Sequence, residues 1–426
     1  MKTDIYNINY IKNESFTNNL TTIIYSLIPV FLIIGTAVSE FAIILLTLRY
    51  LVEIFILKKI KLFKDNLIYF LLIIYFALLV NLIFSVNVNN SFLRNIFFIK
   101  YIIFIIGTIY FLSEKKDRLF LILKIWTLIL IIFSFDLYIQ FFTHKNLIGL
   151  SSPLKYHRLS GFMGDELKAG SLLLSISFVT ACFLITHTKL RNTSLLLLFI
   201  FLITIFITGD RSNFIKSIIV TLSLLLMIDK KYLKKFLFLL ILSFSIISFT
   251  ISNNDVFKER YLKRIYYDLK ISSYNISNFV KKNEYGKIYT SAYALFSQKK
   301  IFGLGNKNYR IICEENFQLK YDLKIKNVQK LRCNTHPHQI YFEILSEHGL
   351  FGLIIMLSLL LMFIYHNLYY VYKSKNILLS SMFISILIVF IPLLPGGSFF
   401  TSFNAVLFWI NFSFFYAYRN ICNQTK

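Results

Sequence analysis

A chain of 426 residues that is 57% hydrophobic, with 46 Phe and 27 Tyr against only 14 Gly and 5 Pro, is too apolar for an ordinary soluble fold. Its repeated apolar runs of about 17 to 25 residues can cross the hydrocarbon layer only as helices, which indicates a polytopic membrane protein. The net charge of +25 comes from short basic clusters between these runs, so topology and attraction to anionic lipid or phosphate explain it, and we expect no nucleic-acid partner.

The apolar runs predict an all-α integral membrane protein of about twelve transmembrane helices with one large extracytoplasmic loop. The predicted spans are residues 21–37, 40–57, 66–85, 94–112, 119–142, 166–187, 194–208, 212–228, 235–251, 338–365, 376–393 and 400–418. The first two are separated near Gly35, because a run of more than about 30 residues is too long for one helix. The single membrane domain then consists of residues 1–251 with spans one to nine, a loop at 252–337, and residues 338–426 with spans ten to twelve.

Basic clusters set the predicted orientation, because short loops that carry Lys and Arg stay in the cytoplasm. Under the twelve-span count the clusters fall on one side: Lys58, Lys59, Lys61 and Lys64; Lys115, Lys116 and Arg118; Lys189 and Arg191; Lys230, Lys231, Lys234 and Lys235; Lys373 and Lys375. Both termini are then cytoplasmic, and the 252–337 loop lies outside.

The 252–337 loop has 17 Lys and Arg against 7 Asp and Glu, a net charge of +10. Its apolar spacing is compatible with short amphipathic helices at 258–271 and 288–296, so we expect it to fold over the membrane surface. Gly303 and Gly305 are read first as a turn, and second as a backbone cradle for phosphate, since two glycines are poorly specific.

Two of the four cysteines, Cys313 and Cys333, lie in this loop. On the oxidising side of the membrane they can form a disulfide that closes a loop of roughly 20 residues. Cys182 lies within a span and Cys422 in the cytoplasm, and we expect both to be unpaired thiols.

The stretch from Thr335 to Gly352 joins the long polar loop to an apolar helix. Pro337 suits a first helical turn and Asn334 or Thr335 can cap it, so the tenth span is predicted to start with His338. On a helical period one face carries His338, Tyr341, Leu345 and Gly349, with Gly352 a turn later. The glycines would let a neighbouring helix approach that face closely.

His338 is the candidate for proton-transfer chemistry, because a neutral imidazole in a substrate cleft can act as a general base near pH 7. The alternative is an interfacial histidine that only binds headgroups or water. A metal site from His336, His338 and His348 is disfavoured, because His348 is about 15 Å further along the helix and no carboxylate or cysteine set completes it. Glu343 and Glu347 must find partners or a wet cavity within the membrane.

Positive charge gathers on the outer side of the predicted topology. Arg211 lies where two spans meet there, and its guanidinium suits phosphate oxygens; the alternatives are a snorkelling anchor or a pair with Asp210. Arg158 precedes Asp165 and Glu166, which can simply favour the N-terminus of the sixth span. Further outer cations are Arg260, Arg264, Lys287, Lys307 and Arg310. Singly these are more often solvated, but together they fit an anionic, membrane-borne substrate better than glycoside hydrolysis.

These residues resemble the O-antigen ligase and polymerase family of membrane glycosyltransferases. The family pattern is His, then Asn, Ser or Gln, nine residues, Gly, two residues, and a small residue or Tyr. It is matched by His338-Gln339 and by Gly349-Leu350-Phe351-Gly352. A preceding His-Pro pair and an acidic residue two before the glycine also match, as His336-Pro337 and Glu347.

Looser family marks lie elsewhere in the chain. Arg211 resembles the family arginine at the outer end of a span, although Ile215 stands where the family often has Leu. The segment from Tyr289 to Arg310 looks like the one before the catalytic helix. Lys287 stands where the family commonly has Arg, which keeps the charge but loses the two-pronged donor.

The resemblance implies an inverting, metal-independent transfer of a glycan from an undecaprenyl-diphosphate carrier to a sugar hydroxyl, without a cofactor, at the bacterial inner membrane. His338 would be the base. The diphosphate would be held by Arg211, Lys287, Arg158 and Arg264. The supporting residues would be His336, Gln339, Glu347, Gly349 and Gly352.

Two possible enzymatic functions differ in the acceptor that they use. A ligase would use a lipid A-core sugar as acceptor, and a polymerase would extend the lipid-linked glycan. A transporter would need ionisable residues through the midplane and often an internal repeat, and neither is evident.

Overall fold

The computed structural model describes residues 2–55, 67–154, 157–189, 191–264, 266, 284–318 and 332–424, with side chains from residue 16 onward apart from 316–318. Within these ranges the chain is helical and contains no strands, so the predicted all-α class is confirmed. The basic cluster at 58–64 and most of the 265–283 segment, which held part of a predicted amphipathic helix, lie outside the described residues.

The N-terminal half of the chain runs as successive helices joined by short connections. They are α1 (Lys2–Ile34), α2 (Thr36–Phe55), α3 (Leu67–Ile83), α4 (Val88–Ile96), α5 (Ile99–Glu114), α6 (Lys116–Thr143), η2 (Gly161–Met163), α7 (Ala169–His187), α8 (Arg191–Ile207), α9 (Arg211–Leu225) and α10 (Lys230–Asn253). The predicted break near Gly35 is confirmed, because α1 ends at Ile34 and α2 begins at Thr36.

The rest of the chain forms the segment between α10 and α16 and the last helices. They are α11 (Asp255–Lys258), a π-helical turn η3 (Glu259–Lys263), α14 (Glu284–Gln298), α15 (Tyr309–Gln318), α16 (Ile340–Ser374), α17 (Ile377–Leu387), η4 (Ile388–Phe390) and α18 (Ser402–Gln424). The described parts of the 252–337 loop include α14 and α15, so part of this loop is helical as expected.

Among the described residues, six helices are long and apolar enough to cross a membrane. They cover Phe16–Ile34, Val88–Glu114, Lys116–Thr143, Ala169–His187, Lys230–Asn253 and Ile340–Ser374, and shorter apolar helices cover Leu67–Ile83, Arg191–Ile207 and Ile377–Phe390. The chain therefore has the helices of a polytopic membrane protein, while the count of twelve spans stays a prediction.

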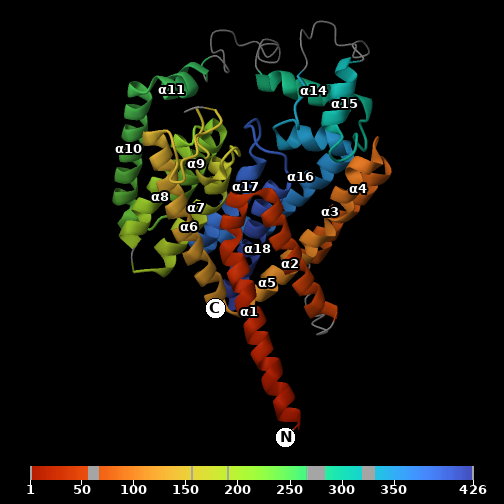
Figure 1. Ribbon diagram of the computed structural model, residues 1–426, viewed down its shortest axis with the longest axis vertical. Coiled ribbons are helices and arrows are strands. Elements are labelled where there is room, and N and C mark those ends of the chain that lie inside the picture. Colours follow the sequence, from red (N-terminus) through yellow and green to blue (C-terminus); the bar gives the residue numbers. More distant parts are fainter. Residues whose placement is uncertain are drawn as a thin grey trace.

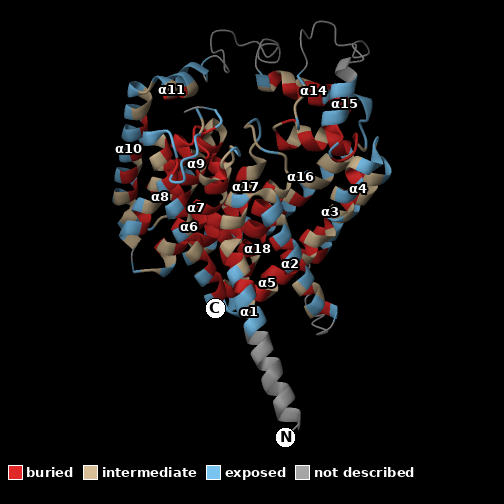
Figure 2. Ribbon diagram, in the orientation of Figure 1, coloured by how far each residue is buried: buried red, intermediate tan, exposed pale blue. Residues whose placement is uncertain are grey.

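Burial is concentrated in the middle of the bundle, and α18 lies there in contact with α2, α5, α7 and α17 (Figure 2). Trp409 and Phe415 of α18 are buried. The outer faces are apolar instead, and on α10 Phe238 and Phe249 are 64% and 71% exposed. In water such a surface would be unfavourable, but in lipid it is the expected exterior.

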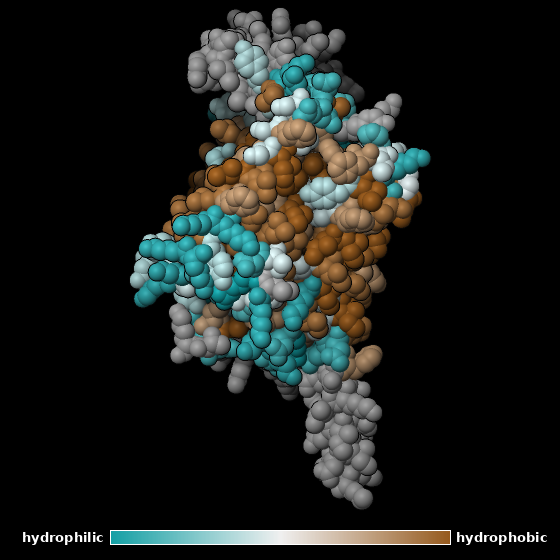
Figure 3. Space-filling view, turned by 90° about the vertical axis from the view of Figure 1, so that its left-hand side faces the viewer, coloured by the Kyte–Doolittle hydropathy of each residue, from teal (hydrophilic) through white to brown (hydrophobic). Residues whose placement is uncertain are grey.

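One face of the molecule displays this distribution directly. Figure 3 shows hydrophobic residues across the middle of that face, a smaller hydrophilic group near one end, and a large group of hydrophilic residues toward the other end, which carries the N-terminus. Both termini lie at this end, and α11, α14 and α15 lie at the opposite end (Figure 1). The termini and the described part of the large loop thus lie at opposite ends of the bundle.

Which of these two sides is extracytoplasmic stays a prediction, and labelling tests it. In a background without Cys182 and Cys422, Lys299→Cys at the exposed end of α14 is expected to react with a membrane-impermeant maleimide added from outside. Lys373→Cys, at the exposed end of α16, is expected to react only after the membrane is opened. The reverse pattern would contradict the orientation.

The start of α16 corrects a prediction. The helix begins at Ile340 rather than His338, because Gln339 is its N-cap and not Asn334 or Thr335. His338 has a φ of 57° and so lies in a left-handed turn before the helix. Gly349 has φ 67° and ψ −165°, which breaks the helix again. The predicted single face running from His338 to Gly349 therefore does not exist.

Candidate active site

The turn before α16 holds the two motif histidines against each other. Their ring centroids are 4.1 Å apart, and the edge of the Tyr285 ring faces His338 at 6.2 Å. The amide nitrogen of Asn334 lies 2.8 Å from Nε2 of His338. An amide N–H can only donate, so Nε2 accepts and the ring proton is on Nδ1. His338 thus presents a basic nitrogen that an incoming hydroxyl reaches by displacing Asn334.

Burial lowers the pKa of both histidines. The pKa of His336 falls to about 4, chiefly because the ring is desolvated and secondly because His338 lies beside it. The pKa of His338 is lowered from 6.5 by burial and by the positive charge of Arg332, with the Gly396 carbonyl acting in the opposite direction. Both rings are therefore neutral at pH 7, as a general base must be.

Gln339, the residue after His338 in the motif, uses its side-chain oxygen to cap the start of α16. Its Oε1 accepts hydrogen bonds from the backbone N–H groups of Tyr341 and Phe342 at 2.8 and 3.1 Å. These donors have no partner within the helix, so the cap fixes where α16 starts and how His338 leaves it.

The motif glycine and acidic residue hold α16 against the loop that precedes α15. A Cβ on Gly349 would overlap the carbonyl of Ile301 and the backbone nitrogen of Gly303. The Glu347 carboxylate accepts from the backbone N–H of Tyr309 at 3.2 Å, and its carbonyl accepts from Gly305 at 2.8 Å. Gly349 thus admits a loop backbone, where we expected a neighbouring helix.

Gly303 and Gly305 serve this packing. Both have positive φ, at 72° and 97°. A Cβ on Gly303 would overlap the backbone of Glu347, and one on Gly305 would overlap the Ser85 side chain. Gly303 and Gly305 therefore form a turn and not a phosphate cradle, because protein backbone and side chains already fill the space beside them.

Buried amides fix the same loop from the other side. The Asn81 side chain donates to the carbonyl of Glu347 at 2.8 Å and accepts from the backbone N–H of Asn306 at 3.0 Å. Asn95 donates to Asn81 at 3.1 Å and accepts from Asn306 at 2.9 Å. α3, α4 and the bend of α16 are thereby joined through neutral side chains.

Arginines gather at the start of α9. Arg158 and Asp210 form an ion pair at 2.8 Å, and Asp210 also caps α9. Arg260 donates to the carbonyl of Gly209, and its pKa is lowered to about 10 by burial first and by the charges of Arg158 and Arg211 next. Three guanidinium groups therefore lie close together around one carboxylate, and this excess of positive charge suits an anion. Arg158 rather than Arg211 is the ion-pair partner found for Asp210.

The α17–α18 loop, residues 391–401, connects this cluster with the histidines. The Pro395 carbonyl accepts from the Ser212 hydroxyl and from Nζ of Lys216, the latter at 3.5 Å. The next residue, Gly396, donates its N–H to the carbonyl of His338 at 2.7 Å, and its carbonyl accepts from Nε2 of His336 at 3.3 Å. The N-terminal end of α9 and the His338 turn therefore share one short segment.

Lys287 and Arg264 occupy different surroundings. Nζ of Lys287 lies 3.8 Å from the carboxylate of Glu284, which also pairs with Arg332. These three charged side chains connect α14 to the segment that leads into the His338 turn. Arg264 is exposed at the end of η3. Arg264 follows Arg260 by four residues, but no hydrogen bond or ion pair among the described residues joins its side chain to the arginine cluster.

A disulfide between Cys313 and Cys333, with Cα atoms 5.7 Å apart, ties α15 to the residue before Asn334. It anchors the approach to the His338 turn. Neither Cys182 nor Cys422 takes part in a disulfide within the described part of the chain.

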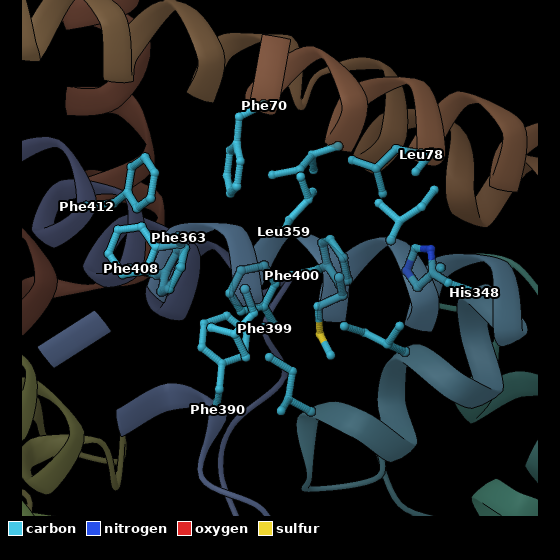
Figure 4. Close-up of a pocket in the computed structure, with 18 of the residues that line it drawn as sticks. Phe70, Leu78, His348, Leu359, Phe363, Phe390, Phe399, Phe400, Phe408 and Phe412 are labelled. Atoms are coloured by element: carbon cyan, nitrogen blue, oxygen red, sulfur yellow. The ribbon is translucent and has the colours of Figure 1, made fainter. Parts of the chain in front are cut away.

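Below the turn, an apolar cavity of about 110 Å³ lies between α3, α16 and α18. Phenylalanines line it, including Phe70, Phe363 and Phe400, and the His348 ring lies at one end (Figure 4). Gly352 lines it as well, one turn from His348. His348 is thus separated from His338. Within the described residues no group of three or more His, Cys, Asp or Glu could hold a metal ion.

Sequence reasoning missed Lys216 and the α17–α18 loop. Lys216 is only 7% exposed, and an ionisable residue inside an apolar span was the available signal. Pro395 and the two glycines after it are typical of an ordinary turn. The sequence of the α17–α18 loop does not indicate which helices the loop contacts.

Comparison with known families adds an independent finding. Residues 196–357 match the family model described as O-Antigen ligase. The match includes Arg211, Lys287 and the whole stretch from His338 to Gly352, whereas Arg158 precedes it. A search of curated proteins finds no match.

Proposed function

The chain is a member of the O-antigen ligase and polymerase family, and from this premise we propose that it transfers a glycan from an undecaprenyl-diphosphate carrier to a lipid A-core sugar hydroxyl. In this proposal the reaction takes place at the outer face of the bacterial inner membrane. The observation that carries the proposal is the contact of Pro395 with Ser212 of α9 and of Gly396 with the backbone carbonyl of His338, which connects the turn that holds the neutral imidazole to the start of α9, where the guanidinium groups gather.

In the proposed reaction His338 is the base. The acceptor hydroxyl replaces Asn334 at Nε2 and gives its proton to that nitrogen as its oxygen attacks the anomeric carbon. The new glycosidic bond forms as the bond from that carbon to the diphosphate oxygen breaks, and the electron pair leaves with undecaprenyl diphosphate. Attack opposite the leaving group inverts the anomeric configuration.

Arg211 and Arg158 bind the diphosphate in this proposal, and Arg260 adds charge beside them. Lys287 lies beside the His338 turn, where the acceptor would bind. Arg264 is exposed and contributes only to the overall positive potential of this surface. Guanidinium groups offset the negative charge that develops on the leaving diphosphate, which supports a metal-independent reaction. A lowered pKa for His336 keeps the ring beside the base neutral, so it does not oppose protonation of His338.

The pH dependence of transfer tests the base assignment. Activity needs neutral His338, and burial lowers its pKa from 6.5, so kcat/KM is expected to be constant above pH 6.5 and to fall as pH decreases below it. Arg332→Ala removes a positive charge that lowers this pKa, so the acid limb is expected to move to higher pH. A downward shift in the variant would contradict the assignment, as would an acid limb centred above 6.5 in the wild type.

The acceptor is tested with purified protein, lipid-linked glycan and lipid A-core, supplied together or with the core left out. Product on the core is the expected result. Lengthened carrier-linked chains in place of core product would identify a polymerase. Loss of activity with a chelator would overturn the metal-independent mechanism.

A further inference from the structure

Three attachments of the α17–α18 loop to the rest of the protein follow one another between Pro395 and Phe399. Pro395 binds α9, and Gly396 binds the His338 turn, as described above. Two residues later, the Ser398 hydroxyl and the Phe399 N–H donate to the two oxygens of the Glu343 carboxylate, the second at 3.0 Å. The loop thus runs from the arginine cluster past His338 to the first turn of α16.

Glu343 and His338 hold neighbouring points of this loop from one short segment of chain. His338 binds Gly396 through its backbone carbonyl, and Glu343 binds Ser398 and Phe399 through its side chain. The two segments, 338–343 and 396–399, are therefore closed into a hydrogen-bonded ring. If the Glu343 attachment is removed, Ser398 and Phe399 lose their acceptor, and only the bonds of Gly396 to His338 and His336 still hold the loop beside the histidines.

The carboxylate of Glu343 is not placed to touch a substrate. The residue is 2% exposed, and both oxygens accept hydrogen bonds from the loop. A buried carboxylate bound to a backbone N–H and a hydroxyl is a rigid anchor, because each bond fixes a direction as well as a distance. Its effect on chemistry must therefore pass through the loop.

We propose that Glu343 is a positioning residue that, through Ser398 and Phe399, sets the place of His338 relative to the Arg211 end of α9. The inference deepens the proposed function and rests on it. A small displacement of a base from its reacting hydroxyl costs up to about 100-fold in rate, whereas the arginines that bind the donor keep their own contacts. Loss of Glu343 therefore lowers kcat and leaves KM for the lipid-linked donor nearly constant.

The test compares Glu343→Ala, Glu343→Gln and Ser398→Ala in the full-length protein. Glu343→Ala is expected to lower kcat about 10- to 100-fold with KM changed less than about threefold. Gln keeps an oxygen for the Phe399 N–H and restores much of the rate. Because both single variants break the same attachment, Glu343→Ala with Ser398→Ala together should lose little more than Glu343→Ala alone. Glu53→Ala removes a mostly buried carboxylate bound to Arg49 in α2 and serves as the matched control.

A second measurement does not depend on transfer. Hydrogen exchange of peptides covering 395–401 and 332–339 is expected to become faster in Glu343→Ala, and unchanged in Glu53→Ala. Unchanged exchange in Glu343→Ala would overturn the proposal, and so would faster exchange with a normal kcat or a change confined to KM. If the wild type transfers no glycan at all, the proposed function fails, and exchange at 332–339 alone decides whether Glu343 holds the His338 turn.

Discussion

Replacing His338 with Asn is expected to abolish glycan transfer, with a loss of at least about 100-fold, while the protein stays folded in the membrane. Asn tolerates the left-handed backbone at this position, where φ is 57°, so the variant removes the basic nitrogen without the strain that Ala would add. The rate is measured with purified protein and lipid-linked glycan, and folding by thermal unfolding in detergent.

His144 provides the matched control. It is also a histidine with positive φ, at 67°, and it caps the end of α6 at an exposed position. His144→Asn should keep normal activity, which separates a general effect of the substitution from loss of the base. Near-normal transfer by His338→Asn would remove this residue from the mechanism.

Gly349→Ala is expected to destabilise the protein by about 2–5 kcal/mol. Two costs combine, because a non-glycine residue at φ 67° is strained by about 1–3 kcal/mol and because the new methyl group overlaps the backbone of the loop before α15. The measurement is the midpoint of thermal unfolding in detergent, together with the yield of folded protein in membranes.

Gly149→Ala separates the two costs. Gly149 has φ 86°, and nothing lies within 4 Å of a Cβ built there, so this variant bears the backbone strain alone. We expect it to lose only about 1 kcal/mol. Equal losses at Gly149 and Gly349 would show that the contact between the bend of α16 and the loop contributes nothing to stability.

The helical class and the motif around His338 could be predicted from the sequence because both depend only on neighbouring residues. Long apolar runs leave helices as the only option in lipid, and the motif around His338 has a fixed spacing. The helix start was placed two residues early because a Pro favours a first turn, whereas the side chain of Gln339 is long enough to cap from further along the chain. Local rules rank such alternatives but do not choose between them.

The parts that sequence reasoning did not reach depend on distant segments. The bend at Gly349 exists because the backbone of Ile301 and Gly303 lies against it, and Arg158 meets Asp210 across 52 residues of chain. Glu343 was expected to need a partner, but the partner is a loop more than 50 residues later. Such pairings are set by the three-dimensional packing of helices rather than by any periodicity.

The buried amides of Asn81, Asn95 and Asn306 have a consequence for any titration of this protein. Amides neither gain nor lose protons across the working pH range, so their contacts to the bend of α16 persist as acidity changes, and the bond from Tyr309 to the Glu347 carboxylate is the titratable contact described beside them. Had carboxylates or imidazoles made these contacts, acid would loosen the scaffold and protonate the base together. A mild acid limb in the rate should therefore be reversible on returning to neutral pH, since it reports the imidazole and not a loosened fold.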